Sequence, residues 1–237
     1  MLFVWYKVSF DEKWSHGSAV CETVYFFVEF VCVFPWKCVS LNNQNRGKIM
    51  DGILRKLPIG IQTFEKLREG DYLYVDKTAL VWRIASTETP YFLSRPRRFG
   101  KSLLLSTFEA YFEGKKELFE GLAIADMEKE WKTYPLFHLD LNAEKYDSPQ
   151  ALVEILSRQL TQWELKYGKG EDEETLSGRF AGVIRRACEQ SGRGVVVLVD
   201  EYDKPLLQAL GDDALLDDYR KTLKAFYGVL KSSDRYL

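Results

Sequence analysis

Apolar residues recur every three to four positions along several stretches of the chain, which is the spacing of an amphipathic helix. The clearest stretch is 149–167, whose apolar face carries Leu152, Ile155, Leu156, Leu160 and Trp163. The same spacing, or a short amphipathic pattern, predicts further helices over 64–69, 77–86, 101–112, 176–190 and 215–230.

Other segments have the composition of β-strands. Residues 194–199 form a continuous, mostly β-branched run, which predicts a strand buried on both faces of a parallel sheet. Shorter strands are predicted over 71–75, 90–94 and 135–141. Because strands alternate with helices, we expect an α/β fold.

A phosphate-binding loop is predicted between the strand 90–94 and the helix 101–112. The segment reads Arg95-Pro96-Arg97-Arg98-Phe99-Gly100-Lys101-Ser102-Leu103. Its Gly-Lys-Ser matches the end of the pattern G-x-x-x-x-G-K-[ST], which follows a strand and precedes a helix. Arg95 stands where the pattern has its first glycine.

The chemistry of phosphate binding explains these residue types. Gly100 allows a backbone turn that points N–H groups at phosphate, and the following helix adds the positive end of its dipole. Lys101 would place its ammonium between the β- and γ-phosphates, and Ser102 would offer its hydroxyl to Mg²⁺. The alternative is an accidental Gly-Lys-Ser at a helix start, and the loop alone does not decide between the two.

A second motif follows the buried strand 194–199. It ends in Asp200 and Glu201, and desolvated charges are costly unless they have a partner. We expect Asp200 to hold Mg²⁺ and Glu201 to polarise the attacking water. The alternative is a strand end leading into a helix capped by Asp203. A nuclease interpretation fails on spacing, since Lys204 lacks an acid two positions before it.

Several other residues are weaker candidates. Asp140 ends the strand 135–141 and either faces the site or caps a loop. His138 is expected to be a packed strand residue. Arg97 and Arg98 either contact phosphate or a neighbouring subunit, or lie on a solvated loop. The charge run 171–174 is expected to be solvated, and Cys188 to pack as a small hydrophobe.

Composition excludes some classes of function. The net charge is −2, from 33 basic and 35 acidic residues, so the chain has no global field for nucleic acid or an anionic membrane. The four cysteines contain no C-x-x-C pair and the two histidines lie far apart, which argues against zinc and a disulfide framework. The expected location is the reducing cytoplasm.

Residues 1–49 differ from the rest of the chain. They hold three of the four cysteines and eleven aromatic residues. The apolar run 24–34 contains Glu29 and is shorter than the roughly 20 residues that span a bilayer. We expect Met50 to be the natural start and 1–49 to be a non-native or disordered extension, with 46–48 encoded by purine-rich, ribosome-binding codons. A membrane-contacting segment is the alternative.

Three segments together resemble the bacterial predicted AAA-ATPase-like family. They are Tyr-Val-Asp-Lys-Thr at 74–78, the loop at 95–102, and Asp-Glu-Tyr-Asp-Lys-Pro at 200–205, and the resemblance covers about 57–237. The family's own loop commonly has the Arg-Pro-Arg-Arg form, so Arg95 fits it. The resemblance implies a P-loop NTPase three-layer sandwich with a mainly parallel sheet, using ATP and Mg²⁺.

The resemblance also implies a missing part. Such ATPases usually order their sheet 5-1-4-3-2, and strand four would begin where this chain stops, at Leu237. We therefore expect residues 50–237 to be the N-terminal part of a truncated domain that is inactive by itself. Family members often carry a restriction-like nuclease domain after the ATPase, so nucleic acid is expected as a partner only through that domain. Further copies of the same chain, in a homo-oligomer, are another possible partner.

Three functions remain open at this stage. The leading one is ATP binding with slow hydrolysis that drives a conformational change in a larger protein. The others are a nucleotide-dependent scaffold without turnover and a P-loop phosphotransferase. Glu201 favours hydrolysis because a glutamate there suits water activation, and the lack of an arginine-rich lid argues against a kinase.

Overall fold

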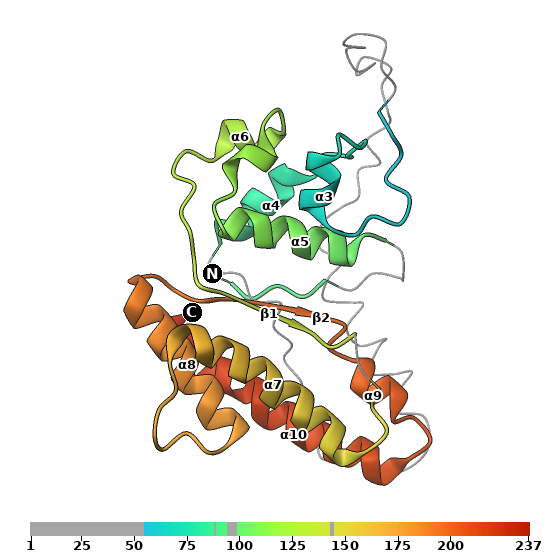
Figure 1. The fold of residues 1–237 in the computed structure, drawn as a ribbon, viewed down its shortest axis with the longest axis vertical. Helices are drawn as coiled ribbons and strands as arrows, with labels where there is room; N and C mark the ends of the chain where they lie inside the picture. The colour runs from blue at the N-terminus through green and yellow to red at the C-terminus, as the bar shows by residue number, and fades with distance from the viewer. Residues whose placement is uncertain (1–54, 88, 94–98, 143–144) are drawn as a thin grey trace. The chain divides into compact units, whose positions relative to one another are not determined.

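The structure is a computed structural model that describes residues 55–87, 89–93, 99–142 and 145–237 (Figure 1). Lys56–Leu237 fall within one compact unit. The predicted extension 1–49 and the start at Met50 lie outside the described residues. The same is true of Arg95–Arg98 in the phosphate loop.

Two parallel strands form the sheet of the described residues. They are β1 (Leu136–Asp140) and β2 (Val196–Asp200), and their register runs from Leu136 opposite Val196 to Asp140 opposite Asp200. All five residues of β2 are buried, as its continuous apolar run predicts. The parallel pair joined through helices confirms the predicted α/β class.

Long helices cover one face of this sheet. They are α7 (Pro149–Tyr167), α8 (Leu176–Ser191) and α10 (Asp213–Ser232). Figure 1 shows the three side by side on one side of the strands. Their apolar faces pack against Phe137 and Leu139 of β1 and Val197 and Val199 of β2. The periodicity of the sequence predicted all three helices to within two residues.

Shorter helices cover the opposite face. They are α3 (Phe64–Glu69), α4 (Thr78–Ala85), α5 (Lys101–Phe112), the 3-10 helix η1 (Lys116–Phe119) and α6 (Ala123–Met127). The alternate side chains of β2, Val196 and Leu198, pack here with Leu105 and Phe108 of α5. The strands therefore lie between two helical groups, and each strand alternates between two cores.

Two predicted strands are absent from the described residues. The segment 71–75 makes only an isolated bridge from Tyr72 to Lys56, because Asp71 has a left-handed φ of 49° that interrupts an extended chain. Residues 91–93 belong to no strand, although Pro90, at the start of the predicted segment, takes part in a β-bridge. Ser94, which ends that prediction, lies outside the described residues.

Four short elements carried no helical period in the sequence: η1, α6, α9 (Lys204–Gln208) and η2 (Asp234–Tyr236), although a helix start at Asp203 was the alternative interpretation of the segment after β2. Each is one or two turns long, so too few positions exist to show a helical period.

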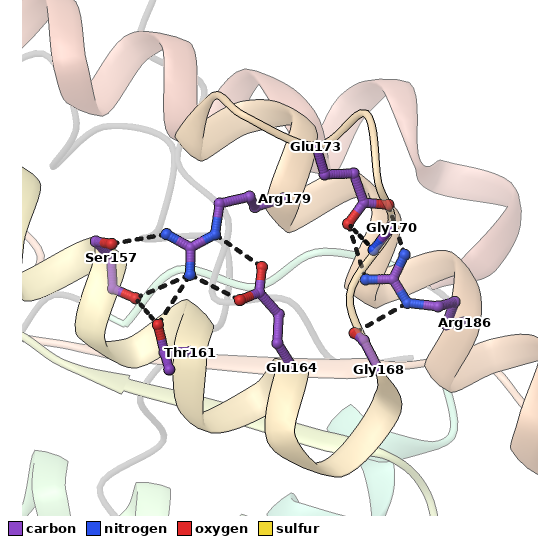
Figure 2. Close-up of polar contacts among 8 residues, drawn as sticks. All are labelled: Ser157, Thr161, Glu164, Gly168, Gly170, Glu173, Arg179 and Arg186. Atoms are coloured by element: carbon purple, nitrogen blue, oxygen red, sulfur yellow. Dashed lines mark hydrogen bonds and ion pairs between the residues drawn. The ribbon is translucent and has the colours of Figure 1, made fainter.

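A buried arginine joins α7 to α8 (Figure 2). Arg179 donates through Nε and Nη2 to the two carboxylate oxygens of Glu164, each at 2.7 Å. Its Nη1 reaches Ser157 Oγ at 2.6 Å, and Nη2 also reaches Thr161 Oγ1 at 2.9 Å. Glu164 raises the pKa of Arg179 above its usual value. The pair is thus desolvated, and all three guanidinium nitrogens and both carboxylate oxygens are hydrogen-bonded.

A second arginine holds the loop between the same helices. Arg186 donates to both carboxylate oxygens of Glu173, at 2.5 and 2.9 Å, and to the Gly168 carbonyl at 3.1 Å (Figure 2). The Gly170 N–H donates to Glu173 as well, at 3.1 Å. The prediction that the charge run 171–174 is solvated is therefore wrong for Glu173, whose carboxylate lies against Gly182 and is mostly buried.

Candidate nucleotide site

The helix α5 begins at a residue whose backbone only glycine adopts without cost. Gly100 occupies the N-cap position with φ 76° and ψ 26°, in the left-handed region. Its carbonyl accepts from Leu104 N at 2.9 Å and so closes the first helical turn. The first N–H groups of α5 have no partner within the helix, which is the usual setting for an anion. The predicted bounds of this helix are confirmed.

The two predicted motifs meet at the start of α5 and the end of β2. Ser102 Oγ donates to Asp200 Oδ2 at 2.8 Å across 98 residues of sequence. Asp200 is 9% exposed, and its other oxygen accepts from Glu201 N at 3.0 Å. A hydroxyl and a carboxylate oxygen are ligands of the kind that Mg²⁺ takes, and Mg²⁺ fills its remaining positions with water and phosphate oxygens. These two residues therefore fit the predicted metal.

A looser contact lies beside the first. Lys101 Nζ is 4.0 Å from Glu201 Oε1, and each side chain is about a quarter exposed, at 26% and 24%. Glu201 has φ 52°, a left-handed conformation that is rare outside glycine and costs on the order of 1–3 kcal/mol. Such strain is concentrated in active sites and ligand clamps, and of the three described non-glycine residues with a left-handed φ, Asp71, Trp131 and Glu201, only Glu201 belongs to a predicted site motif.

The predictions for Asp140 are tested by the register of the sheet. Asp140 lies directly opposite Asp200, so it is at the edge that the two motifs share. Its Oδ1 also accepts from Asn142 N at 2.7 Å, which is the loop-capping alternative. Both interpretations of Asp140 therefore describe part of its position.

His138 is a half-buried strand residue, as predicted, and it also contacts α5. Its Nδ1 lies 3.5 Å from Glu109 Oε1. The hydrogen bond to Glu109 raises the pKa of His138, and the same bond lowers the pKa of Glu109. The other ring nitrogen, Nε2, is buried and has no hydrogen-bond partner among the described residues. Helical and strand periodicity carried no signal for this pair.

The turn after Asp200 leads into α9. Asp203 occupies the N-cap position of α9, as the capping alternative predicts, but its side chain makes no capping hydrogen bond. The ammonium of Lys204 instead donates to Asn142, to the main-chain oxygen and, at 2.6 Å, to Oδ1. The last residues of this motif therefore connect the loops that follow β1 and β2.

The segment Tyr-Val-Asp-Lys-Thr at 74–78 joins the start of α4 to the start of α6. Asp76 accepts from the N–H and hydroxyl of Thr78, at 2.8 and 2.7 Å, and from Ala123 N at 2.7 Å. Thr78 Oγ1 accepts from Ile124 N at 3.1 Å. Burial alone would raise the pKa of Asp76, but these hydrogen bonds lower it. An Asp two residues before a Thr at a helix start is a recognisable local signal, whereas its bond to α6 is not local.

The remaining predicted residues are less informative. Phe99 is exposed, and Leu103 is half-buried against the core on the α5 side of the sheet. Within the described ranges, no three His, Cys, Asp or Glu side chains gather as a metal-binding group. None of the helices described combines the length and apolarity needed to cross a membrane.

Comparisons with known proteins agree with the motifs. Residues 58–237 match the family described as Predicted AAA-ATPase. A protein of Azotobacter chroococcum mcd 1, described as an uncharacterized protein in the vnfD 5' region, is 41% identical over 184 residues. These cover 77% of this chain and 36% of the relative, so the chain spans about a third of that protein's length. No solved structure matches. With most of its length matched, the chain belongs to the predicted AAA-ATPase family.

Proposed function

We propose that this chain binds ATP with Mg²⁺ at the start of α5 and, as part of a larger protein, hydrolyses it within a P-loop three-layer fold. The observation that carries the proposal is the 2.8 Å contact between Ser102 and Asp200. Neither motif alone excludes an accidental match, but an accidental match gives no reason for the two to meet.

Each residue of the site has a separate task in this proposal. The N–H groups at the start of α5 receive the phosphates, and the Lys101 ammonium neutralises the β- and γ-phosphate oxygens. Ser102 and Asp200 would hold Mg²⁺. The bound ion would supply charge neutralisation at the transferring phosphoryl group. These groups act by position and charge, which is the main requirement of phosphoryl transfer.

Glu201 is the group that distinguishes hydrolysis from binding alone. It follows Asp200 directly, and its carboxylate lies 4.0 Å from the Lys101 ammonium. The γ-phosphate would compete for Lys101 and release the carboxylate to accept a proton from, or orient, a water molecule. A scaffold that switches without turnover needs Lys101 and Asp200 but has no use for this carboxylate.

Two substitutions test the proposal in the full-length protein. Lys101→Ala should abolish ATP binding measured by calorimetry, and Glu201→Gln should preserve binding while stopping phosphate release. Unchanged affinity in Lys101→Ala would contradict the nucleotide site. Hydrolysis by Glu201→Gln at the wild-type rate would remove Glu201 from the mechanism, whereas binding without hydrolysis in the wild type itself would favour a scaffold or a phosphotransferase.

A further inference from the structure

The turn that carries Glu201 is fastened at both ends. At its start, Leu141 N donates to the Asp200 carbonyl at 3.2 Å, which extends the parallel ladder one residue beyond β1. At its end, Lys204 N donates to the Glu201 carbonyl at 3.0 Å. Between these points the backbone passes through the left-handed φ of Glu201.

The side chain of Lys204 closes this turn against the neighbouring strand. Its ammonium donates to the main-chain oxygen of Asn142 and to Oδ1 of the same residue. Asn142 in turn donates its N–H to Asp140 at 2.7 Å. A lysine ammonium is strongly hydrated and usually stays in water, whereas here two of its donors are used on one residue of the other loop. The contact joins the carboxyl ends of the two strands.

A strained backbone persists only where the surrounding structure determines it. The strained residue here is Glu201, and the Lys204–Asn142 contact is a side-chain bond at the far end of its turn. We propose that Lys204 is a positioning residue: it holds the 201–204 turn so that the Glu201 carboxylate faces Lys101 and the nucleotide. The inference rests on the proposed function for the role it gives to Glu201.

This proposal differs from a direct role for Lys204 on phosphate. A lysine that contacts the nucleotide contributes to affinity, so its removal weakens binding. A lysine that orients Glu201 contributes to turnover, since Glu201 acts after binding. A misplacement of about 1 Å in a catalytic group can cost on the order of a hundredfold in rate. The ratio of the two effects therefore decides between the roles.

Lys204→Met in the full-length protein is the first test. We expect turnover to fall by about tenfold or more while the Kd for MgATP stays within about threefold of wild type. Lys204→Arg retains donors that can reach both Asn142 oxygens and should recover most of the turnover. Asn142→Ala removes one of the two acceptors and should cause a smaller loss in the same direction. The double variant should be no slower than Lys204→Met alone, because both changes remove one contact.

Hydrogen exchange gives a measurement that does not depend on turnover. Lys204→Met should speed amide exchange in a peptide spanning 200–208 while exchange in α7 stays unchanged. Unchanged exchange and turnover would overturn the proposal, as would a loss of MgATP affinity that matches the loss of turnover. If Glu201→Gln hydrolyses ATP at the wild-type rate, the role proposed for Glu201 is wrong, and the exchange result still decides whether Lys204 holds the turn.

Discussion

Two polar clusters of this protein use the same kinds of side chain in opposite ways. Between α7 and α8, Arg179 makes bonds of 2.6 to 3.3 Å to Glu164, Ser157 and Thr161, and both charged groups are buried. At the end of β2, Lys101 and Glu201 are 4.0 Å apart and each is about a quarter exposed. Within the described residues, all three guanidinium nitrogens of Arg179 and both carboxylate oxygens of Glu164 are hydrogen-bonded, whereas the side chains of Lys101 and Glu201 make only their loose contact with each other.

The difference separates stability from function. A buried charge whose hydrogen bonds are all satisfied cannot take a ligand without losing them, so the Arg179 cluster serves to hold α7 to α8. A loose, partly exposed ion pair loses little when a phosphate replaces one partner. We therefore expect substitutions in the first cluster to lower the free energy of unfolding, and substitutions in the second to change nucleotide binding or turnover.

Arg179→Met should have the largest effect on stability. It leaves the Glu164 carboxylate buried without its partner, and breaking such a pair costs about 3–5 kcal/mol. Urea unfolding followed by circular dichroism measures the change. Arg185→Met is the matched control, since this side chain is exposed on the same helix. Equal stability of the two variants would show that the buried pair contributes nothing beyond a surface charge.

Gly182→Ala should disturb the second arginine contact of the same region. An added methyl group would overlap the Glu173 carboxylate and push it from Arg186. We expect a loss of about 1–3 kcal/mol, as for other overpacking substitutions. Gly228→Ala in α10 is the control: nothing lies within 4 Å of its added carbon, so it should stabilise the helix by roughly 0.5–1 kcal/mol. Changes of the same sign would contradict this account.

Ser102→Ala should weaken Mg²⁺-dependent ATP binding by about tenfold, or roughly 1.4 kcal/mol, with a smaller loss of stability. It removes the hydroxyl that contacts Asp200 and leaves the helix intact. Calorimetric titration with and without Mg²⁺ separates the metal-dependent part. Ser106→Ala, one turn later on α5, removes bonds to the start of α3 instead and should leave affinity unchanged. A loss of affinity in Ser106→Ala alone would place the site elsewhere on α5.

The sequence predicts those parts of the structure in which an apolar pattern repeats over several turns or a fixed motif is present. The helices 101–112 and 149–167 were predicted to the residue, because each repeats its apolar pattern over several turns. The contact between Ser102 and Asp200 followed from two motifs, because a phosphate loop and an acidic metal motif must lie beside each other to act on one nucleotide. Each of these signals lies within a short window of sequence.

The remaining contacts depend on which side chains the fold brings together. Arg179 and Arg185 stand on the same predicted helix, and only tertiary packing decides that the first is buried and the second exposed. Asp76 reaches Ala123, and Lys204 reaches Asn142, over separations of 47 and 62 residues. The segment 71–75 alternates as a strand does, but among the described residues only Tyr72 pairs, through its isolated bridge to Lys56. Pairing is a property of two segments, so one segment alone cannot predict it.

The smallest expected effect is at the contact of His138 on β1 with Glu109 on α5, and it depends on pH. The folded pKa of His138 is raised, so its contribution to stability is fully present below its unfolded pKa, about 6.5, and is lost as pH rises through the folded value. The folded pKa of Glu109 is lowered, so its contribution is present above about 4.3 and is lost as pH falls. The pair should therefore stabilise the fold most between about pH 4.3 and 6.5.

His138→Asn measures this contribution against wild type. Glu109 is the largest cause of the raised pKa of His138, and the charges of Asp140 and Asp200 raise it further. Glu109→Gln should therefore reduce the change of stability with pH without abolishing it. About a third of each side chain is exposed, and solvent screening limits the effect to less than about 1 kcal/mol. Urea unfolding at pH 5.5 and at pH 8.5 should show a larger difference between His138→Asn and wild type at the lower pH. A difference that grows toward pH 8.5 would mean that the neutral ring is the stabilising form, with Glu109 only a neighbour.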